Sequence, residues 1–347
     1  MSDIQSFRDA VESFISARGW TATRFGRQMA GDPLFVFDLR EGREPRSDTR
    51  TRILKAMQEQ GETPAAAPLS MTYLPGSDDG LIQGHLFSVP VTIGDYQTHF
   101  ILDTGIGINL ISSKLADKLG CPNTGVVFRG QRMSGQTVSV PLSWLPGLAV
   151  GASRQQFVTC GVFDFKGFLP ATPAFSKIEG FLSLRFFQHV AFTVDYEHLQ
   201  IVIETDSSLK QRLERGTQVA LELDDDQGVS LTAFALLQLP GSRTAKVEVD
   251  TGSDSLILHK RFMAALGVSP DQKDVKTVRG KDETAHSFVR YFANVNAGKI
   301  SLGGFERTPG RVMFQDIIHD GLIGDEFLKH YTVTYDLAHS RMILGKR

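Results

Sequence analysis

The spacing of apolar residues changes near residue 61 and divides the chain into a helical part and a strand-rich part. Before this point, apolar residues recur at the three- and four-residue spacing of amphipathic helices, as at Ile4, Phe7, Val11 and Phe14. Glycines and capping residues then predict four short helices: one that stops at Gly19, and three over residues 21–30, 33–40 and 47–60.

After this point, apolar and polar residues alternate, which indicates strands. Two predicted hairpins stand out, over residues 89–102 and 231–249, and each has a short turn at its centre. Both hairpins end in an aspartate, Asp103 in the first case and Asp250 in the second. The pattern therefore predicts a mainly β region with one acid at the end of a buried strand in each half.

The two acids belong to a longer internal repeat. Asp103-Thr-Gly recurs 147 positions later as Asp250-Thr-Gly, and Leu119-Gly recurs as Leu266-Gly at the same offset. Later matches follow at offsets of 152 and 141, which indicates insertions in the loops of duplicated lobes. Because a buried acid is costly to keep charged without a partner, two acids in matching contexts predict one paired site.

Residues 61–71 lack periodicity and contain two prolines, which is typical of a linker. We therefore predict a helical domain over residues 1–60, a linker over residues 61–71, and two lobes over residues 72–206 and 207–347.

Composition and charge narrow the possible locations and partners. Hydrophobic residues make up 41% and charged residues 22% of the chain, and a net charge of −2 argues against a chain that coats nucleic acid or membrane. No apolar run approaches the roughly 20 residues of a spanning helix, and charges interrupt the N-terminal apolar pattern where a signal peptide has none. Cys121 and Cys160 lack the spacing of a zinc site, and the sequence alone leaves open whether they form a disulfide. We expect a cytoplasmic protein without membrane partner, metal or cofactor.

The duplicated Asp-Thr-Gly motif and its surroundings resemble the aspartic proteases over residues 72–347, as a retropepsin-type or pepsin-like enzyme with two lobes in one chain. The resemblance implies two homologous β-barrel lobes, a catalytic pair Asp103 and Asp250, and a peptide or protein substrate. Late in each lobe the family has a glycine after two apolar residues. Lobe two has it at Gly324, whereas lobe one has Ser183.

The resemblance also assigns supporting roles to five loop residues: Thr104, Gly105, Thr251, Gly252 and Ser253. The threonines would hydrogen-bond across the lobes, and the glycines would leave room for backbone beside the acids. The serine hydroxyl could bond to the Asp250 carboxylate, whereas lobe one has Ile106 at that position, where the family usually has alanine or serine. We therefore expect unequal hydrogen bonding of the two acids.

Two further hairpins are candidates for the flaps that cover an aspartic protease site. They lie around residues 129–136 and 279–286, with Gly130 and Gly280. Neither hairpin has the tyrosine of pepsin-like flaps, which retroviral-type enzymes also lack.

The four N-terminal helices resemble the helix-turn-helix domains of phage-repressor-type regulators, with a tight turn at Gly31-Asp32-Pro33. Between residues 18 and 55 there are nine basic and five acidic residues, a modest positive excess that suits phosphates. Arg40 and Arg43, which follow the candidate recognition helix, are the candidate DNA contacts. The alternative is a small interaction domain whose arginines pair with nearby carboxylates.

Two functions follow from these patterns. The first is a cytoplasmic aspartic endopeptidase, in which a water activated by the Asp103 and Asp250 pair hydrolyses peptide bonds, with an N-terminal domain that binds DNA. The second is a DNA-binding regulator whose protease-like part binds or senses a peptide without cleaving it. The sequence leaves open the oligomeric state and whether the two acids pair within one chain.

Overall fold

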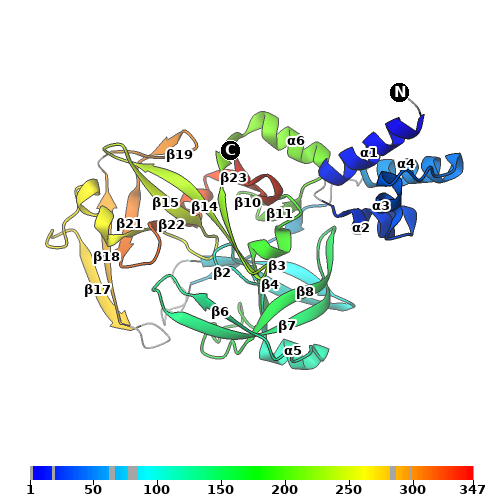
Figure 1. The fold of residues 1–347 in the computed structure, drawn as a ribbon. Coiled ribbons are helices and arrows are strands. Elements are labelled where there is room, and N and C mark those ends of the chain that lie inside the picture. The colour runs from blue at the N-terminus through cyan, green and yellow to red at the C-terminus, as the bar shows by residue number, and fades with distance from the viewer. Residues whose placement is uncertain are drawn as a thin grey trace. The chain divides into compact units, whose positions relative to one another are not determined.

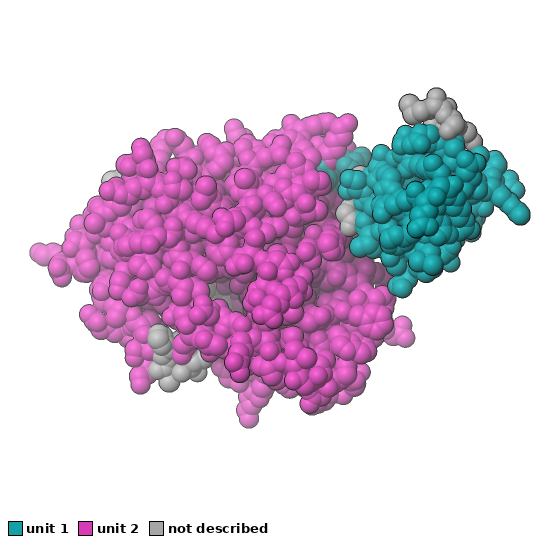
Figure 2. All heavy atoms as spheres, in the orientation of Figure 1, with its two compact units in different colours: residues 1–66, 205–209 teal, residues 67–204, 210–347 magenta. Residues whose placement is uncertain are grey.

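The structure is a computed structural model that describes residues 3–17, 20–61, 67–76, 85–281, 287–296 and 298–346. Its chain divides into two compact units (Figures 1 and 2), one made of residues 1–66 and 205–209 and the other of residues 67–204 and 210–347. The sequence predicts a division into four segments, and the boundaries of these segments remain a prediction.

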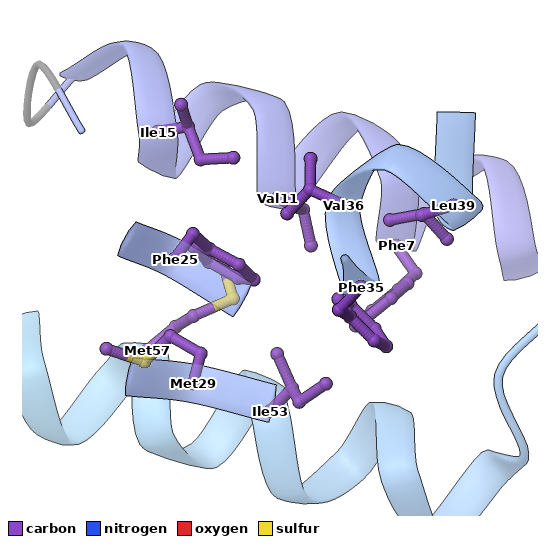
Figure 3. Packing of buried hydrophobic residues seen from close by; sticks show 10 residues of the cluster. All are labelled: Phe7, Val11, Ile15, Phe25, Met29, Phe35, Val36, Leu39, Ile53 and Met57. Atoms are coloured by element: carbon purple, nitrogen blue, oxygen red, sulfur yellow. The ribbon is translucent and has the colours of Figure 1, made fainter. Parts of the chain in front are cut away.

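The first unit consists of short helices around one apolar core (Figure 3). The elements are α1 (Asp3–Ala17), α2 (Ala22–Phe25), the π-helical turn η1 (Gly26–Ala30), α3 (Phe35–Arg40) and α4 (Ser47–Gly61). Ten buried apolar side chains from these elements contact one another: Phe7, Val11, Ile15, Phe25, Met29, Phe35, Val36, Leu39, Ile53 and Met57. The helical periodicity of the sequence is thus reproduced in the packing.

The helix starts follow local capping. The Thr21 hydroxyl accepts the N–H of Arg24 at 3.1 Å and caps α2. The third helix begins at Phe35, two residues later than we predict, because the Asp32 carboxylate accepts the N–H of Leu34 at 2.9 Å and first closes a turn. Gly26 lies at the close approach of two segments, since a Cβ there would be 2.3 Å from the Asp32 carbonyl oxygen.

The second unit contains two lobes, each built on its own sheet. Lobe one has eight strands in the order β2-β3-β4-β9-β5-β8-β7-β6 within the described residues. The strands are β2 (Thr72–Pro75), β3 (His85–Ile93), β4 (Tyr96–Leu102), β5 (Leu110–Ser112), β6 (Val127–Gln131), β7 (Thr137–Val150), β8 (Ser153–Phe163) and β9 (Ile178–Leu182). Two short helices, α5 (Ser113–Leu119) and η2 (Leu184–Phe187), follow β5 and β9.

Lobe two repeats this plan in a larger sheet, with the described strands in the order β17-β18-β21-β16-β22-β15-β14-β19-β20 and β13 paired to β14. The strands are β13 (Glu222–Asp226), β14 (Ser230–Leu239), β15 (Arg243–Val249), β16 (Leu256–His259), β17 (Lys276–Lys281), β18 (Ser287–Val295), β19 (Ile300–Leu302), β20 (Phe305–Arg307), β21 (Gly310–Gln315) and β22 (Gly321–Ile323). Its short helices are η3 (Lys260–Phe262), η4 (Ala264–Leu266) and α7 (Asp325–Leu328).

A third sheet joins the lobes, in the order β1-β11-β10-β23-β24-β12. Its strands are β1 (Leu69–Ser70), β10 (Phe192–Asp195), β11 (Gln200–Ile203), β12 (Thr217–Ala220), β23 (Tyr331–Asp336) and β24 (Arg341–Lys346), with α6 (Asp206–Arg215) and η5 (Leu337–His339) between them in the chain. Thr193 of β10 pairs with Thr334 of β23, and their hydroxyls are 2.7 Å apart. These threonines are equivalent in the sequence repeat, so their contact marks the pseudo-twofold relation of the lobes.

The predicted fold class is confirmed: the protein is mainly β, with two repeated lobes and a small helical region at the N-terminal end. No helix among the described residues is long and apolar enough to span a membrane.

Candidate active site

The two repeated aspartates occupy equivalent positions at the ends of parallel strand pairs. Asp103 follows β4, and its N–H donates to the Leu182 carbonyl of β9 at 3.0 Å. Asp250 follows β15, and its N–H donates to the Ile323 carbonyl of β22, also at 3.0 Å. In each lobe the neighbouring strand therefore fixes the backbone from which the acid projects.

The structure brings the two carboxyl groups together, close enough for each to change the pKa of the other. Each carboxyl group lies against the motif glycine of the opposite loop. A Cβ on Gly105 would be 2.4 Å from the Asp250 carboxyl carbon, and a Cβ on Gly252 would be 2.6 Å from that of Asp103. Glycine is required at both positions because any side chain would occupy the place of the other acid.

The motif threonines hold the two loops together through four buried hydrogen bonds. The Thr104 hydroxyl donates to the Val249 carbonyl at 2.6 Å and accepts the N–H of Thr251 at 2.9 Å. The Thr251 hydroxyl donates to the Leu102 carbonyl at 2.9 Å and accepts the N–H of Thr104 at 3.1 Å. Each hydroxyl thus bonds to the backbone of the opposite lobe as donor and as acceptor.

Burial and mutual repulsion disfavour two negative charges at this site. Burial, followed by the charge of Asp250, raises the pKa of Asp103 well above its usual range. Burial raises the pKa of Asp250 from 3.8 to about 6, although hydrogen bonds from the Gly252 N–H and from Asp103 lower it in part. The pair therefore retains one proton in a pH range where isolated aspartates are ionised.

The expected difference between the acids does not arise from the Ser253 hydroxyl, although the Ile106 N–H acts on the pKa of Asp103 alone. The Ser253 hydroxyl donates to the Ser255 carbonyl at 3.4 Å, so it adds nothing to the Asp250 carboxylate. Instead, each carboxylate accepts the N–H of the motif glycine two residues further on, from Gly105 at 3.0 Å and from Gly252 at 2.7 Å. Backbone donors that both loops share supply these bonds, and the side chain after the motif does not.

Lobe one differs from the family pattern at Ser183 and Ile106, and the structure accommodates these two residues differently. Ser183 replaces the glycine seen at Gly324, and its N–H and hydroxyl both donate to the Asn109 side-chain oxygen, at 3.0 and 3.2 Å. Ile106 packs against the apolar core of lobe one. Gly324 has no such freedom, since a Cβ there would be 2.1 Å from the Ser253 carbonyl oxygen.

Behind the loops lies a buried polar group that our sequence analysis missed. Asp325, at the start of α7, is fully buried, and burial raises its pKa well above its usual range. The hydroxyl of Tyr196 lies close enough to lower this pKa in part, and His85 Nε2 is 3.5 Å from Asp325 Oδ2. The available signal was Asp325 directly after Gly324 in lobe two, since lobe one has the apolar Leu184 at the position of this acid.

The flap candidates are both hairpins, as far as the structure describes them. In lobe one β6 and β7 pair on either side of the turn Arg132–Gln136, with Gly130 in β6 opposite Val138. The Ile318 N–H of lobe two donates to the Met133 carbonyl at 3.0 Å, so this hairpin reaches across to the other lobe. In lobe two Gly280 pairs with Phe288, whereas the predicted tip at residues 282–286 lies outside the described residues.

The candidate DNA contacts of the helical unit are engaged in ion pairs. Arg40 donates from two nitrogens to the Glu12 carboxylate, at 2.8 and 2.9 Å. Arg43 pairs with Asp38 at 2.6 Å and with Asp32 at 3.5 Å. All these side chains are partly exposed.

Comparison with known proteins assigns the two lobes. A profile of the aspartyl protease family matches residues 89–185 and 237–327, more than half of the chain. The protein therefore belongs to the aspartyl protease family. A crystal structure of an aspartic proteinase from Irpex lacteus aligns with 80% of this chain and 97% of its own, at 13% sequence identity and a TM-score of 0.46. No curated protein sequence matches the chain.

Replacing Gly324 and Ser183 each by the equivalent residue of the other lobe should lower the free energy of unfolding by different amounts. We expect Gly324→Ser to cost about 3 kcal/mol or more, because its Cβ meets unyielding backbone. Ser183→Gly should cost about 1 to 2 kcal/mol, since it removes only the hydroxyl bonds and adds backbone freedom. Denaturant unfolding measures both, and Gly324→Ala separates the Cβ from the hydroxyl. Equal costs for the two exchanges would contradict the distinction.

The raised pKa values also predict the pH dependence of stability. Because the folded pKa of Asp250 is about 6 and its unfolded value about 3.8, the native state binds more protons between these values, so stability falls as pH rises. Asp250→Asn cannot ionise and should stabilise the protein at pH 7, by on the order of 3 kcal/mol. The gain should shrink toward pH 4. Melting temperatures of both proteins from pH 4 to 7 test this, and a gain independent of pH would refute it.

Proposed function

We propose that this protein is an aspartic endopeptidase whose catalytic residues are Asp103 and Asp250. The observation that carries the proposal is the contact of the two carboxyl groups, each seated over the glycine of the opposite loop. Both acids come from one chain in this arrangement, so a single copy supplies the pair. The family assignment supports a peptidase, and it implies that the substrate is a peptide or a protein.

The chemistry follows from the shared proton. One ionised carboxylate takes a proton from a water as the water oxygen bonds to the peptide carbonyl carbon, and the protonated acid donates its proton to the carbonyl oxygen. The tetrahedral diol then collapses: the carboxyl group that took the water proton donates it to the nitrogen as the bond between carbon and nitrogen breaks, and the other, now ionised carboxylate takes the proton of one diol hydroxyl, which restores the starting pair. No covalent bond to the enzyme forms, because water and not a side chain attacks the carbonyl carbon.

The competing function is peptide binding without cleavage. It requires the same site geometry but a pair that fails to activate water, and it would leave the helical unit as the effector. The reciprocal threonine bonds and the raised pKa values support catalysis, because rigid loops and one retained proton are what the hydrolytic mechanism needs.

Replacing either acid should abolish hydrolysis. We expect Asp103→Asn and Asp250→Asn each to lower kcat/KM for an unstructured protein substrate by at least about a thousandfold, since each removes a proton-transfer group. A statine-type transition-state mimic should inhibit the unmodified protein. Asp117→Asn, on the exposed surface of α5, is the matched control and should retain activity. Inhibitor and peptide binding without any cleavage would favour the competing function.

For residues 1–60 we keep the proposal of a helix-turn-helix-like domain that binds DNA, in a cytoplasmic protein. The excess of basic residues supports it, and the free thiols of Cys121 and Cys160 suit a reducing compartment. The ion pairs of Arg40 and Arg43 support the alternative of a protein-interaction domain, because those guanidinium groups already have carboxylate partners.

A mobility shift with the full chain separates these two roles. If the domain binds DNA, a duplex should be retarded at about 50 mM salt and released as salt rises, since phosphate contacts release counterions. Arg40→Ala with Arg43→Ala should weaken the shift at least about tenfold, whereas Arg154→Ala in lobe one should not. No retardation at low salt would leave the protein-interaction role.

A further inference from the structure

One row of side chains runs across the lobe-two sheet beside the proposed catalytic pair. Residues paired across neighbouring strands present their side chains on the same face. The register places six residues in this row: Phe234, Glu248, Leu322, Ile257, Met313 and Phe292. Five of them are apolar, and Glu248 carries the one charge. Glu248 precedes Asp250 by two residues and so lies on the same side of strand β15 as that acid.

The equivalent row of lobe one has no charge. Ile101 takes the position of Glu248 at the repeat offset of 147, and it pairs with Ser88 and with Phe181. Phe181 in turn pairs with Leu110. Two aromatic side chains from the loop between β8 and β9, Phe165 and Phe168, pack onto Phe181 and enlarge this apolar surface. The two sides of the site therefore differ in chemistry at one matched position.

Glu248 is buried without a partner. Its exposed fraction is 6%, and among the described residues it accepts no hydrogen bond and pairs with no cation. Burial, followed by the charges of Asp250 and Asp103, raises the pKa of Glu248 well above its usual range. By contrast, Oε1 of the buried Glu204 accepts bonds from Arg212 at 3.0 Å and from Thr193, although its Oε2 has no partner among the described residues. The oxygens of the Glu248 carboxyl group keep contact with solvent while the rest of the side chain is buried, so a cationic group of a ligand can reach them.

The nearest cationic side chain of the same strand is already engaged. Lys246 forms an ion pair with Glu222, and its ammonium lies 4.8 Å from the Phe234 ring centre. His319 also packs on Phe234, and burial lowers the pKa of this histidine, which favours its neutral form. Among the described residues none supplies a cation to Glu248, so a complementary charge can come from the substrate.

The side chains beside Glu248 in this row determine which kind of cationic group fits. Apolar side chains beside Glu248, such as Leu322 and Ile257, suit a methylene chain, and the carboxylate suits a positive group at its end. Glu248 lies two strand residues, roughly 7 Å, from Asp250, which is within reach of a side chain next to the bond being cut. Met133 of the lobe-one hairpin packs on the same cluster, so this hairpin has to move for a substrate side chain to enter.

We propose that Glu248 is a specificity-determining residue that binds the lysine or arginine side chain of the substrate residue held on the lobe-two side of the scissile bond. The assignment rests on the proposed peptidase function, because the substrate is placed by its scissile bond between Asp103 and Asp250. It goes beyond that function in naming the substrate: a peptide with a cationic residue on one side of the cut.

The test uses two statine-type peptides that differ only in lysine or norleucine at the position facing lobe two, titrated calorimetrically into the full chain. We expect the lysine peptide to bind roughly tenfold or more tightly. The preference should vanish in Glu248→Gln and reverse in Glu248→Ile, which copies lobe one. Glu306→Gln, an exposed glutamate of the same lobe, is the control. Both Glu248 variants remove an unpaired buried acid, so both should fold.

A second readout distinguishes recognition from a purely structural role. Binding of lysine favours the ionised form of Glu248, so complex formation should release up to one proton at pH values where the unbound protein keeps Glu248 protonated, detected from titrations in buffers of different ionisation enthalpy. The norleucine peptide should release fewer. Equal affinities for the two peptides, or no binding of either, would overturn the proposal. Because these measurements need no cleavage, a protein that binds lysine but does not hydrolyse would refute the proposed function and leave this assignment intact.

Discussion

The reciprocal hydrogen bonds of Thr104 and Thr251 are the constraint on which the rest of the site depends. Two carboxyl groups at contact distance lose hydration, and they repel each other when both are ionised, so other groups have to hold them in place. Four bonds from two buried hydroxyls tie the loops instead, and each bond crosses from one lobe to the backbone of the other. Hydrogen bonds between neutral groups, the threonine hydroxyls and the backbone, therefore hold the two acids close together.

The same constraint explains which parts of the lobes are alike and which differ. Positions that face the partner loop, Gly105 and Gly252, are identical because each accommodates the other lobe's acid. Positions that face away from it are free to diverge. Lobe one keeps Ser183 in place through Asn109, whereas lobe two has Gly324 pressed against the Ser253 backbone. The loop positions where the two halves touch are therefore identical, whereas these positions away from the contact differ.

Local signals in the sequence were sufficient for the elements and for the pair of acids. Strand alternation and turn residues located the hairpins before Asp103 and Asp250, and the repeat indicated that the acids belong to one site. The direction of the Ser253 hydroxyl was not predictable, since a serine has several acceptors within reach and the Ser255 carbonyl was the one chosen. The start of α3 was missed because Asp32 closes a turn before it caps a helix.

Glu248 was missed for a different reason. Between Lys246 and Asp250 it continues an alternation of polar and apolar residues, which is the pattern of a strand with one solvated face. Only the register across six strands shows that this face carries an apolar row. The sequence does show that Glu248 is equivalent to the apolar Ile101 in the repeat. This difference indicates a role in the site only when the structure places both residues beside the acids.

Fusion of the lobes in one chain is what permits this asymmetry. In a symmetric dimer of identical halves, a glutamate at this position would appear on both sides of the site. Four carboxyl groups would then crowd around one substrate bond, and their mutual repulsion would raise every pKa further and disfavour the ionised acid that catalysis needs. A single chain can carry Glu248 on one side and Ile101 on the other. It thereby gains a charge for recognition while the repulsion stays limited to three groups.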